Sequence, residues 1–249
     1  MPTFGALEVG PVAARLPRMR DLDTEAWELP KAEIVQLSWE VGPGTQALLP
    51  KGMHPAIPAY ASLWVIRYPE SPVGAFALAL LRLMGRAGAH PRGFVLGGIA
   101  SSEAAATALR AQWGLPVAAG QVTFRRSHDR VAVGATRDGA PVLEAALVDP
   151  DMISGGDVQY IHSVTLAQAP LDGVEAPRLI QVDSHYTFHK AERGRPRCAR
   201  LDADAFNAPG LVLAHPIAGS VTTCDTDLPR IRFVMDPDVW VVRSTKRIR

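Results

Sequence analysis

Apolar and polar residues alternate along most of the chain, or gather in short apolar runs that end at Gly, Pro or Asp. Both patterns are typical of β-strands, whose successive side chains point to opposite faces. Asp138-Gly139 between two such runs is a hairpin signal, and Asp183, His185 and Thr187 should share one face of a late strand. The predicted strands cover the ranges 33–39, 61–68, 93–100, 121–126, 130–136, 141–148, 159–166, 179–188, 211–223 and 231–235.

One segment has a helical signature instead. Ser101 or Ser102 can cap the alanine-rich stretch 104–112, alanine has the highest helix propensity, and Gly114 ends the run. Many antiparallel strands with one clear helix predict a mainly β (α+β) fold. We expect an antiparallel β-barrel, closed or partly closed, with a few short helices.

The distribution of prolines and of periodic segments predicts the domain organisation. Residues 1–30 carry prolines without a clear period, which predicts an N-terminal arm. Residues 31–249 contain no internal repeat and no low-complexity linker, which predicts a single domain.

Composition narrows the possible partners. Among 249 residues, 47% are hydrophobic, 20% are charged and the formal net charge is +1, so neither nucleic acid nor an anionic membrane surface is favoured. The two cysteines, Cys198 and Cys224, are too few for a disulfide framework and favour a reducing compartment. The N-terminus has no signal-peptide pattern, and the most apolar stretch, 73–84, is too short to span a bilayer. We therefore expect a cytoplasmic protein.

Several chemical motifs are missing from the sequence. The seven histidines form no H-x-H or H-E-x-x-H pattern, and His185 and His189 would lie about 13 Å apart on one strand, too far to share a metal. There is no G-x-S-x-G elbow and no G-x-x-x-x-G-K-[ST] loop. We expect neither a metal nor a cofactor.

Four segments, in order and with near-gapless spacing, resemble the acetoacetate decarboxylase superfamily. They are a proline-containing loop, strand and glycine turn (48–76), a strand, loop and helix (92–116), a long strand with a polar turn (177–197) and a last strand (227–237). The resemblance covers roughly residues 30–240 and implies a homo-oligomer. It also implies a lysine that forms an imine with a β-keto acid, with its amine kept neutral by an apolar pocket and a nearby cation.

The chain departs from that pattern at the positions that carry the chemistry. Where the resemblance places the lysine, directly after Pro116, this sequence has Val117 and then Ala118. Leu63 and Leu78 align with pocket glutamates of the family. The joint loss of these ionisable groups indicates a change of chemical function. Without the lysine, a buried carboxylate would only add the free-energy cost of desolvating its charge.

Five further residues are candidates for the pocket, each with a plainer alternative. Gly97 and Gly98 either enlarge the pocket or let another backbone segment approach. Lys31 either steers an anionic group at the pocket entrance or lies on the surface. Arg82 either faces a carboxylate or extends to the surface, and Trp113 either stacks on a flat ligand or belongs to the core.

Three polar residues are candidates for catalysis. His162, Gln181 and His185 lie on predicted strands that line the barrel in this family, and each can serve as acid, base or hydrogen-bond donor. The alternative for the histidines is an ordinary surface or core position.

These observations predict a small-molecule enzyme without a Schiff-base lysine that cyclises, isomerises or rearranges a mostly apolar, for example polyketide-like, intermediate. Two alternatives stay open. One is a decarboxylase- or aldolase-type lyase with a relocated lysine, Lys31 or Lys51. The other is a non-catalytic binder of an apolar metabolite.

Overall fold

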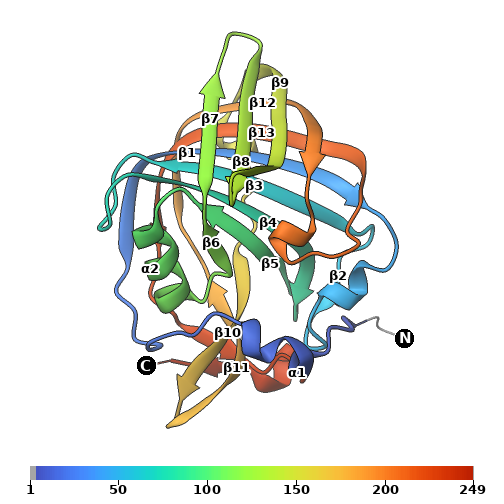
Figure 1. Ribbon diagram of the computed structural model, residues 1–249, viewed down its shortest axis with the longest axis vertical. Coiled ribbons are helices and arrows are strands. Elements are labelled where there is room, and N and C mark those ends of the chain that lie inside the picture. The colour runs from blue at the N-terminus through green and yellow to red at the C-terminus, as the bar shows by residue number, and fades with distance from the viewer. Residues whose placement is uncertain (1–3, 249) are drawn as a thin grey trace.

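The computed structural model describes residues 4–248, and strands dominate it (Figure 1). The mainly β fold with a few short helices is therefore confirmed. The strands are β1 Trp27–Val41, β2 His54–Pro55, β3 Tyr60–Tyr68, β4 Phe76–Ala87, β5 His90–Ala100, β6 Val117–Ala119, β7 Gln121–Arg126, β8 Arg130–Arg137, β9 Ala140–Ile153, β10 Ser163–Leu171, β11 Val174–Val182, β12 Tyr186–Leu201, β13 Leu213–Leu228, β14 Phe233–Met235 and β15 Lys246–Arg247. The helices are α1 Val9–Val12, α2 Glu103–Trp113 and α3 Val241–Ser244, with 3-10 turns η1 Ala13–Arg15, η2 Thr45–Leu48, η3 Gly155–Asp157 and η4 Asp204–Phe206.

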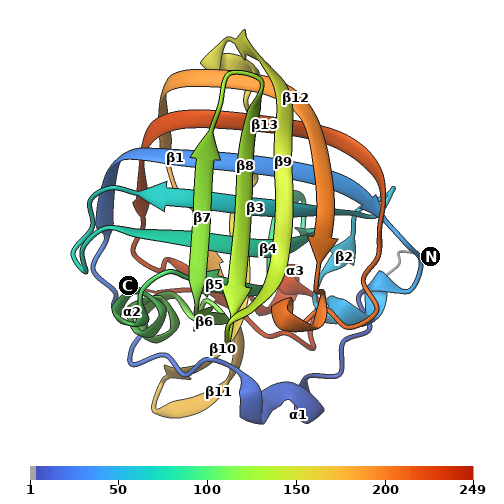
Figure 2. The same cartoon turned by 45° about the horizontal axis from the view of Figure 1, so that its top comes forward.

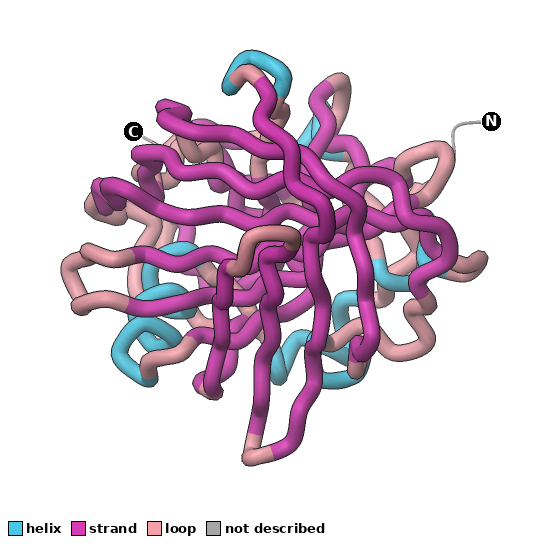
Figure 3. The backbone as a smooth tube through the Cα atoms, turned by 90° about the horizontal axis from the view of Figure 1, so that it is seen from above, coloured by secondary structure: helices cyan, strands magenta, loops and turns pink. Residues whose placement is uncertain are grey.

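All strands belong to one sheet. Its order is β15-β14-β11-β10-β5-β4-β3-β1-β13-β12-β9-β8-β7, while β2 pairs with β4 and β6 with β5. Within residues 4–248 no ladder joins β15 to β7, so the sheet is not closed and the predicted barrel is not confirmed. The sheet instead folds over itself: β7, β8 and β9 cross in front of β12, β13, β1 and β3 (Figure 2), and helical segments lie at the rim of the strands (Figure 3).

Two hydrophobic cores lie on the two faces of the central strands. The first core lies between β7–β9 and the central strands, and the second lies beneath α2 and the N-terminal segment. Strand β3 shows the alternation that builds both, since Leu63 and Val65 belong to the first core and Trp64 and Ile66 to the second. An apolar run without polar alternation thus marks a strand that is buried on both faces.

The single long helix forms where the alanine-rich segment predicts it. The Ser102 hydroxyl accepts a hydrogen bond from the Ala105 amide at 3.4 Å, which caps the first turn of α2. Gly114 ends the helix with φ 60°, a left-handed conformation that suits glycine.

The predicted strand 179–188 is wrong, because the chain breaks at residues 183–185 between β11 and β12. Polar contacts replace the ladder there: the His185 amide donates to the Asp227 carboxylate at 2.7 Å, and Asp183 accepts from the Gln181 amide. Asp183, His185 and Thr187 therefore do not share one face of a strand. The predicted strand 159–166 also begins later than expected, at Ser163.

The N-terminal segment is held at several places along its length. Leu7 forms a bridge with Pro50, and Arg18 forms one with Gln168. β1 begins at Trp27, inside the range predicted as an arm.

No helix in the described part of the chain is long and apolar enough to cross a membrane.

Candidate functional site

A fully buried arginine lies in the middle of the sheet. Arg82 projects from β4 toward the second-core face, opposite Ser62 of β3, and its exposed fraction is 0%. Gly93 on β5 leaves it room, since a Cβ there would lie 3.2 Å from the Arg82 Cδ. The sequence allows two alternatives for Arg82: a carboxylate as its partner, or extension of the side chain to the surface. Both are wrong for this residue.

Neutral oxygens take the place of a carboxylate around this guanidinium. Nη1 of Arg82 lies 2.9 Å from the Ile161 carbonyl oxygen and 3.3 Å from the Ser163 hydroxyl. Nη2 lies 3.3 Å from the Ser62 hydroxyl and 3.4 Å from Oε1 of Gln36. These residues come from four different segments of the fold, so the cation ties β1, β3 and β4 to the chain that leads into β10.

Aromatic rings complete the surroundings of Arg82. Its Cζ lies 3.6 Å from the centre of the Trp64 ring, a cation–π contact. Trp64 in turn packs against Tyr160 at 4.9 Å and Tyr186 at 6.2 Å between ring centroids. Among residues 4–248 no Asp or Glu forms an ion pair with Arg82.

The electrostatics follow from this burial. Desolvation lowers the pKa of Arg82 to about 10, and the surrounding tyrosines only partly oppose that shift. Burial likewise raises the pKa values of Tyr160 and Tyr186, which keeps both phenols protonated and neutral. Arg82 is therefore a fully buried positive charge inside an aromatic and hydroxyl environment.

A hollow of about 260 Å³ opens beside this cluster. Gln36 and Ser220 form part of its inner wall, while the segment 153–159 and Arg193 lie around its mouth. A larger hollow of about 560 Å³ lies between the N-terminal segment and α2, but Arg82 and its partners do not line it. We regard the smaller hollow as the better candidate site because it reaches the buried cation's own hydrogen-bond partner.

The three candidate catalytic residues lie in a second polar cluster. Asp183 accepts from Gln181 Nε2 at 2.9 Å and pairs with the buried Arg92 at 3.3 Å. His185 Nδ1 lies 3.1 Å from an Asp227 carboxylate oxygen. None of these residues lines the hollow beside Gln36, so their catalytic role stays a prediction.

His162 belongs to the same cluster and has an unusual environment. Its Nδ1 atom is buried without a hydrogen-bond partner, and burial lowers its pKa below 6.5, opposed in part by Asp183. A histidine of this kind favours the neutral form in the folded state, whereas the unfolded chain takes up a proton near pH 6.5. The ionisation of His162 therefore costs no folding free energy above pH 6.5. It lowers the free energy of unfolding as the pH falls below 6.5.

We expect His162→Gln to weaken this pH dependence. Between pH 7 and pH 5 the urea midpoint of the native protein should fall more steeply than that of the variant. His215→Gln, at an exposed position on β13, is the control and should follow the native protein. Equal slopes in the native protein and His162→Gln would show that other groups cause the acid sensitivity.

The predicted pocket residues fall on different faces. Leu78 and Val117 both belong to the second core, on the face that carries Arg82. Leu63 belongs to the first core, on the opposite face of the sheet. The structure therefore brings Leu78 and Val117 to one core but separates Leu63 from them.

The two glycines do not enlarge a cavity, so that expectation is corrected. A Cβ on Gly97 would lie 2.5 Å from the Phe206 carbonyl oxygen, and one on Gly98 would lie 2.5 Å from Leu80 and 2.9 Å from Val117. The space that they leave is filled by η4 on one face and by β4 and β6 side chains on the other. The alternative, a site of close packing, applies to both.

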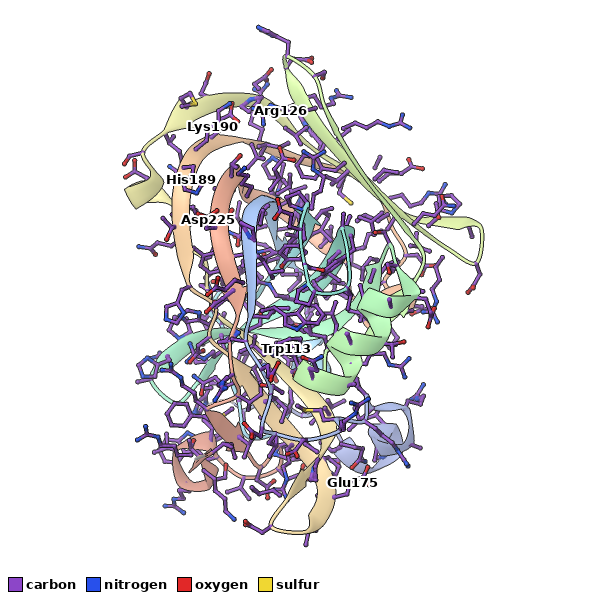
Figure 4. All side chains as sticks on the ribbon, turned by 90° about the vertical axis from the view of Figure 1, so that its left-hand side faces the viewer. Trp113, Arg126, Glu175, His189, Lys190 and Asp225 are labelled. Carbon is purple, nitrogen blue, oxygen red and sulfur yellow. The ribbon has the colours of Figure 1, made fainter. Side chains whose placement is uncertain are left out.

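Trp113 is a core residue and Lys31 is a surface residue, which were the second alternatives given for them by the sequence. Trp113 is fully buried, and its indole N–H donates to the Pro229 carbonyl at 2.8 Å, as a core residue does. Lys31 is exposed, and its backbone N–H donates to Asp225 at 2.9 Å, which together with His189 lowers the pKa of Asp225. Figure 4 shows His189 and Asp225 together on β12 and β13, apart from Trp113 at the end of α2.

Sequence reasoning missed Gln36, Trp64, Tyr160 and Tyr186. One signal was present for Gln36, because it interrupts an apolar run in β1 as Arg82 interrupts one in β4. The aromatic residues had no such signal, since a buried ring looks the same in the sequence whether it packs on leucine or on a guanidinium. In the described part of the chain, no cluster of His, Cys, Asp and Glu could hold a metal ion.

Comparison with known proteins gives a family and a fold. The family described as acetoacetate decarboxylase (ADC) matches residues 14–229. No curated protein matches the chain.

Three solved structures share the fold at low sequence identity. Acetoacetate decarboxylase from Legionella pneumophila subsp. pneumophila str. Philadelphia 1 has a TM-score of 0.72 and 16% identity over 84% of this chain and 86% of that one. MppR, an enduracididine biosynthesis enzyme, has a TM-score of 0.68 and 18% identity over 84% and 89%. An acetoacetate decarboxylase-like enzyme from Sphingomonas wittichii RW1 has a TM-score of 0.65 and 16% identity over 91% and 97%.

Proposed function

Because this chain belongs to the acetoacetate decarboxylase family, we propose that it is a small-molecule enzyme that works without a lysine imine. The reaction would cyclise, isomerise or otherwise rearrange a mostly apolar biosynthetic intermediate. One observation carries the proposal: the interior holds an arginine stacked on a tryptophan, while all the lysines of the chain lie at its surface. Those lysines are Lys31, Lys51, Lys190 and Lys246.

The surroundings of the lysines argue against their use as nucleophiles. An imine-forming amine has to be neutral, which requires a lowered pKa. Lys51 instead pairs with Glu8 at 2.7 Å, and this hydrogen bond raises its pKa. At the position where the sequence resemblance places the family's lysine, the side chain is that of Val117, which is buried in the second core and carries no amine.

The fold itself supports chemistry other than decarboxylation. MppR has been crystallised with the condensation product of pyruvate and imidazole 4-carboxaldehyde. In this chain, the walls of the hollow beside Gln36, including Ile153 and Val158, would hold one conformer of a substrate, which is how a site without a covalent intermediate can accelerate a rearrangement.

The first test is reductive trapping. The protein is incubated with pyruvate, acetoacetate and larger β-keto acids in the presence of borohydride, and its intact mass is measured. We expect no adduct and no release of carbon dioxide, because no neutral amine is available inside the fold. A reduced adduct mapped to Lys31 or Lys51 would instead establish the lyase with a relocated lysine.

A second function, non-catalytic binding of an apolar metabolite, is favoured by the close packing around Arg82. The guanidinium has no exposed surface, so a ligand in the present conformation reaches Gln36 but not the cation. Tight binding of a metabolite that is recovered unchanged would favour this function over catalysis.

Family membership also motivates a proposal about the protein in the cell. We propose a cytoplasmic homo-oligomer, for which light scattering of the purified protein gives the mass.

A further inference from the structure

Gln36 lies in a row of residues that runs across the sheet. Arg193 of β12 pairs with Ser220 of β13, Ser220 with Gln36 of β1, and Gln36 with Trp64 of β3. Directly opposed residues share one face of a sheet. Arg193, Ser220 and Gln36 all line the 260 Å³ hollow, so the row leads from its mouth to the indole that stacks on Arg82.

The orientation of the Gln36 amide is fixed by two donors. Its Oε1 atom accepts from the Trp64 indole N–H at 2.5 Å and lies 3.4 Å from Nη2 of Arg82. A flipped amide would place its own N–H groups against these donors, so the network assigns oxygen to the interior. The Nε2 amino group then points away from Arg82, and within residues 4–248 no hydrogen bond from it is formed.

Arg82 makes the Nε2 amino group of Gln36 a stronger hydrogen-bond donor. A cation on the carbonyl oxygen polarises the amide, and hydrogen bonds in such a chain reinforce one another in a low-dielectric interior. The outer N–H groups therefore donate more strongly than those of a surface glutamine. The other walls of the hollow are mixed: Ile153, Val158 and Ala218 give it an apolar part, while Asp157, Gln159, Arg193 and Ser220 give it a polar part.

We propose that this hollow is the substrate subsite for a carbonyl or carboxylate oxygen, which accepts a hydrogen bond from Nε2 of Gln36 while the apolar body lies against Ile153 and Val158. The inference rests on the proposed function, since it names the part of the substrate that the site recognises. Arg82 is a positioning residue here, because it acts through Gln36 and does not touch the ligand.

The decisive variant is Gln36→Glu. Glutamate keeps an acceptor for Trp64 and Arg82 and gives the buried cation a counter-ion, so the thermal midpoint should rise by about 2–4 °C. The same change replaces the outward N–H groups by an acceptor, so binding of a carbonyl oxygen should weaken at least about tenfold. A Gln36 that only supports the fold would leave binding unchanged.

Two probes of the same shape, benzoate and acetophenone, separate charge from hydrogen bonding. The side-chain amide signal of Gln36, assigned by its loss in Gln36→Glu, should shift when either probe is added to the native protein. Gln121→Glu is the matched control, because it places the same charge at an exposed position of β7 that does not line the hollow and makes no hydrogen bond to Arg82. It should retain the binding of acetophenone.

Three results would overturn the inference: no shift of the Gln36 amide with either probe, equal binding of acetophenone by Gln36→Glu and the native protein, or equal losses in Gln36→Glu and Gln121→Glu. None of them bears on the reductive trapping. A trapped lysine, in turn, would remove the proposed function and leave the hydrogen-bond result standing, so the two failures are distinguishable.

Discussion

Arg82→Met is expected to stay folded with a free energy of unfolding within about 1 kcal/mol of the native protein, whereas Arg82→Ala should lose about 3–5 kcal/mol. Methionine fills a similar volume without the charge. Alanine removes the side chain from a site with no access to water and leaves a cavity in the middle of the sheet.

Two effects of similar size oppose each other in the methionine variant. The lowering of the Arg82 pKa to about 10 means that the charge opposes folding by roughly 3 kcal/mol at neutral pH. As the pH rises, the folded state releases this proton before the unfolded state does, so the cost is complete below pH 10 and fades only at higher pH. Losing the guanidinium leaves the Ile161 carbonyl without its partner, which costs about 1–3 kcal/mol and nearly offsets the gain.

Urea unfolding followed by far-ultraviolet circular dichroism measures both variants without relying on Trp64 fluorescence. A loss of more than about 3 kcal/mol in Arg82→Met would mean that the hydrogen bonds and the indole contact outweigh the cost of burying the charge. The expected near-equality would instead show that the guanidinium adds little net stability at this position, as the proposed positioning role for Arg82 allows.

Gly97→Ala is expected to destabilise the protein by about 2–4 kcal/mol. The added Cβ would lie 2.5 Å from the Phe206 carbonyl oxygen and 2.6 Å from its carbon. Both are backbone atoms, which cannot rotate aside as a side chain can, so either β5 or η4 has to move. Phe206 is fully buried in the first core, and its displacement would carry further packing losses.

Gly10→Ala provides the control for this prediction, because a Cβ at Gly10 would meet nothing within 4 Å. Its free energy of unfolding should stay within about 0.5 kcal/mol of the native value. Denaturant midpoints of the two variants give the comparison directly. Equal midpoints would mean that η4 yields easily and that room for a larger side chain exists at Gly97 after all.

Local patterns in the sequence were sufficient for much of the fold. The serine cap and Gly114 fix the ends of α2, and the Asp138-Gly139 turn joins β8 to β9. The apolar run in β3 was recognisable because its neighbours on both faces are apolar. Each of these features depends on residues within one element or its turn.

Features that depend on distant residues were not predictable in the same way. The break at residues 183–185 results from Arg92 and Asp227, which are remote in sequence and compete with the ladder for the polar side chains. The meeting of Gln36, Trp64 and Arg82 needs the register of β1, β3 and β4, which periodicity does not specify. The interior cation was visible as a residue, but its neutral partners were not.

The two-sided burial of the central strands also decides how a molecule larger than the hollow could enter. Spreading β3 from β4 would open both cores at once, so the sheet cannot act as the gate. The segment 153–162 borders the hollow and is held by side-chain contacts, among them the Tyr160–Thr222 hydroxyl pair and the hydrogen bonds from Arg193 to the Asp157 carbonyl and from Arg82 to the Ile161 carbonyl. If the hollow binds substrate as proposed, a bulky ligand would enter by displacement of this segment, and the speed of that movement would limit turnover for bulky ligands while leaving small ones unaffected.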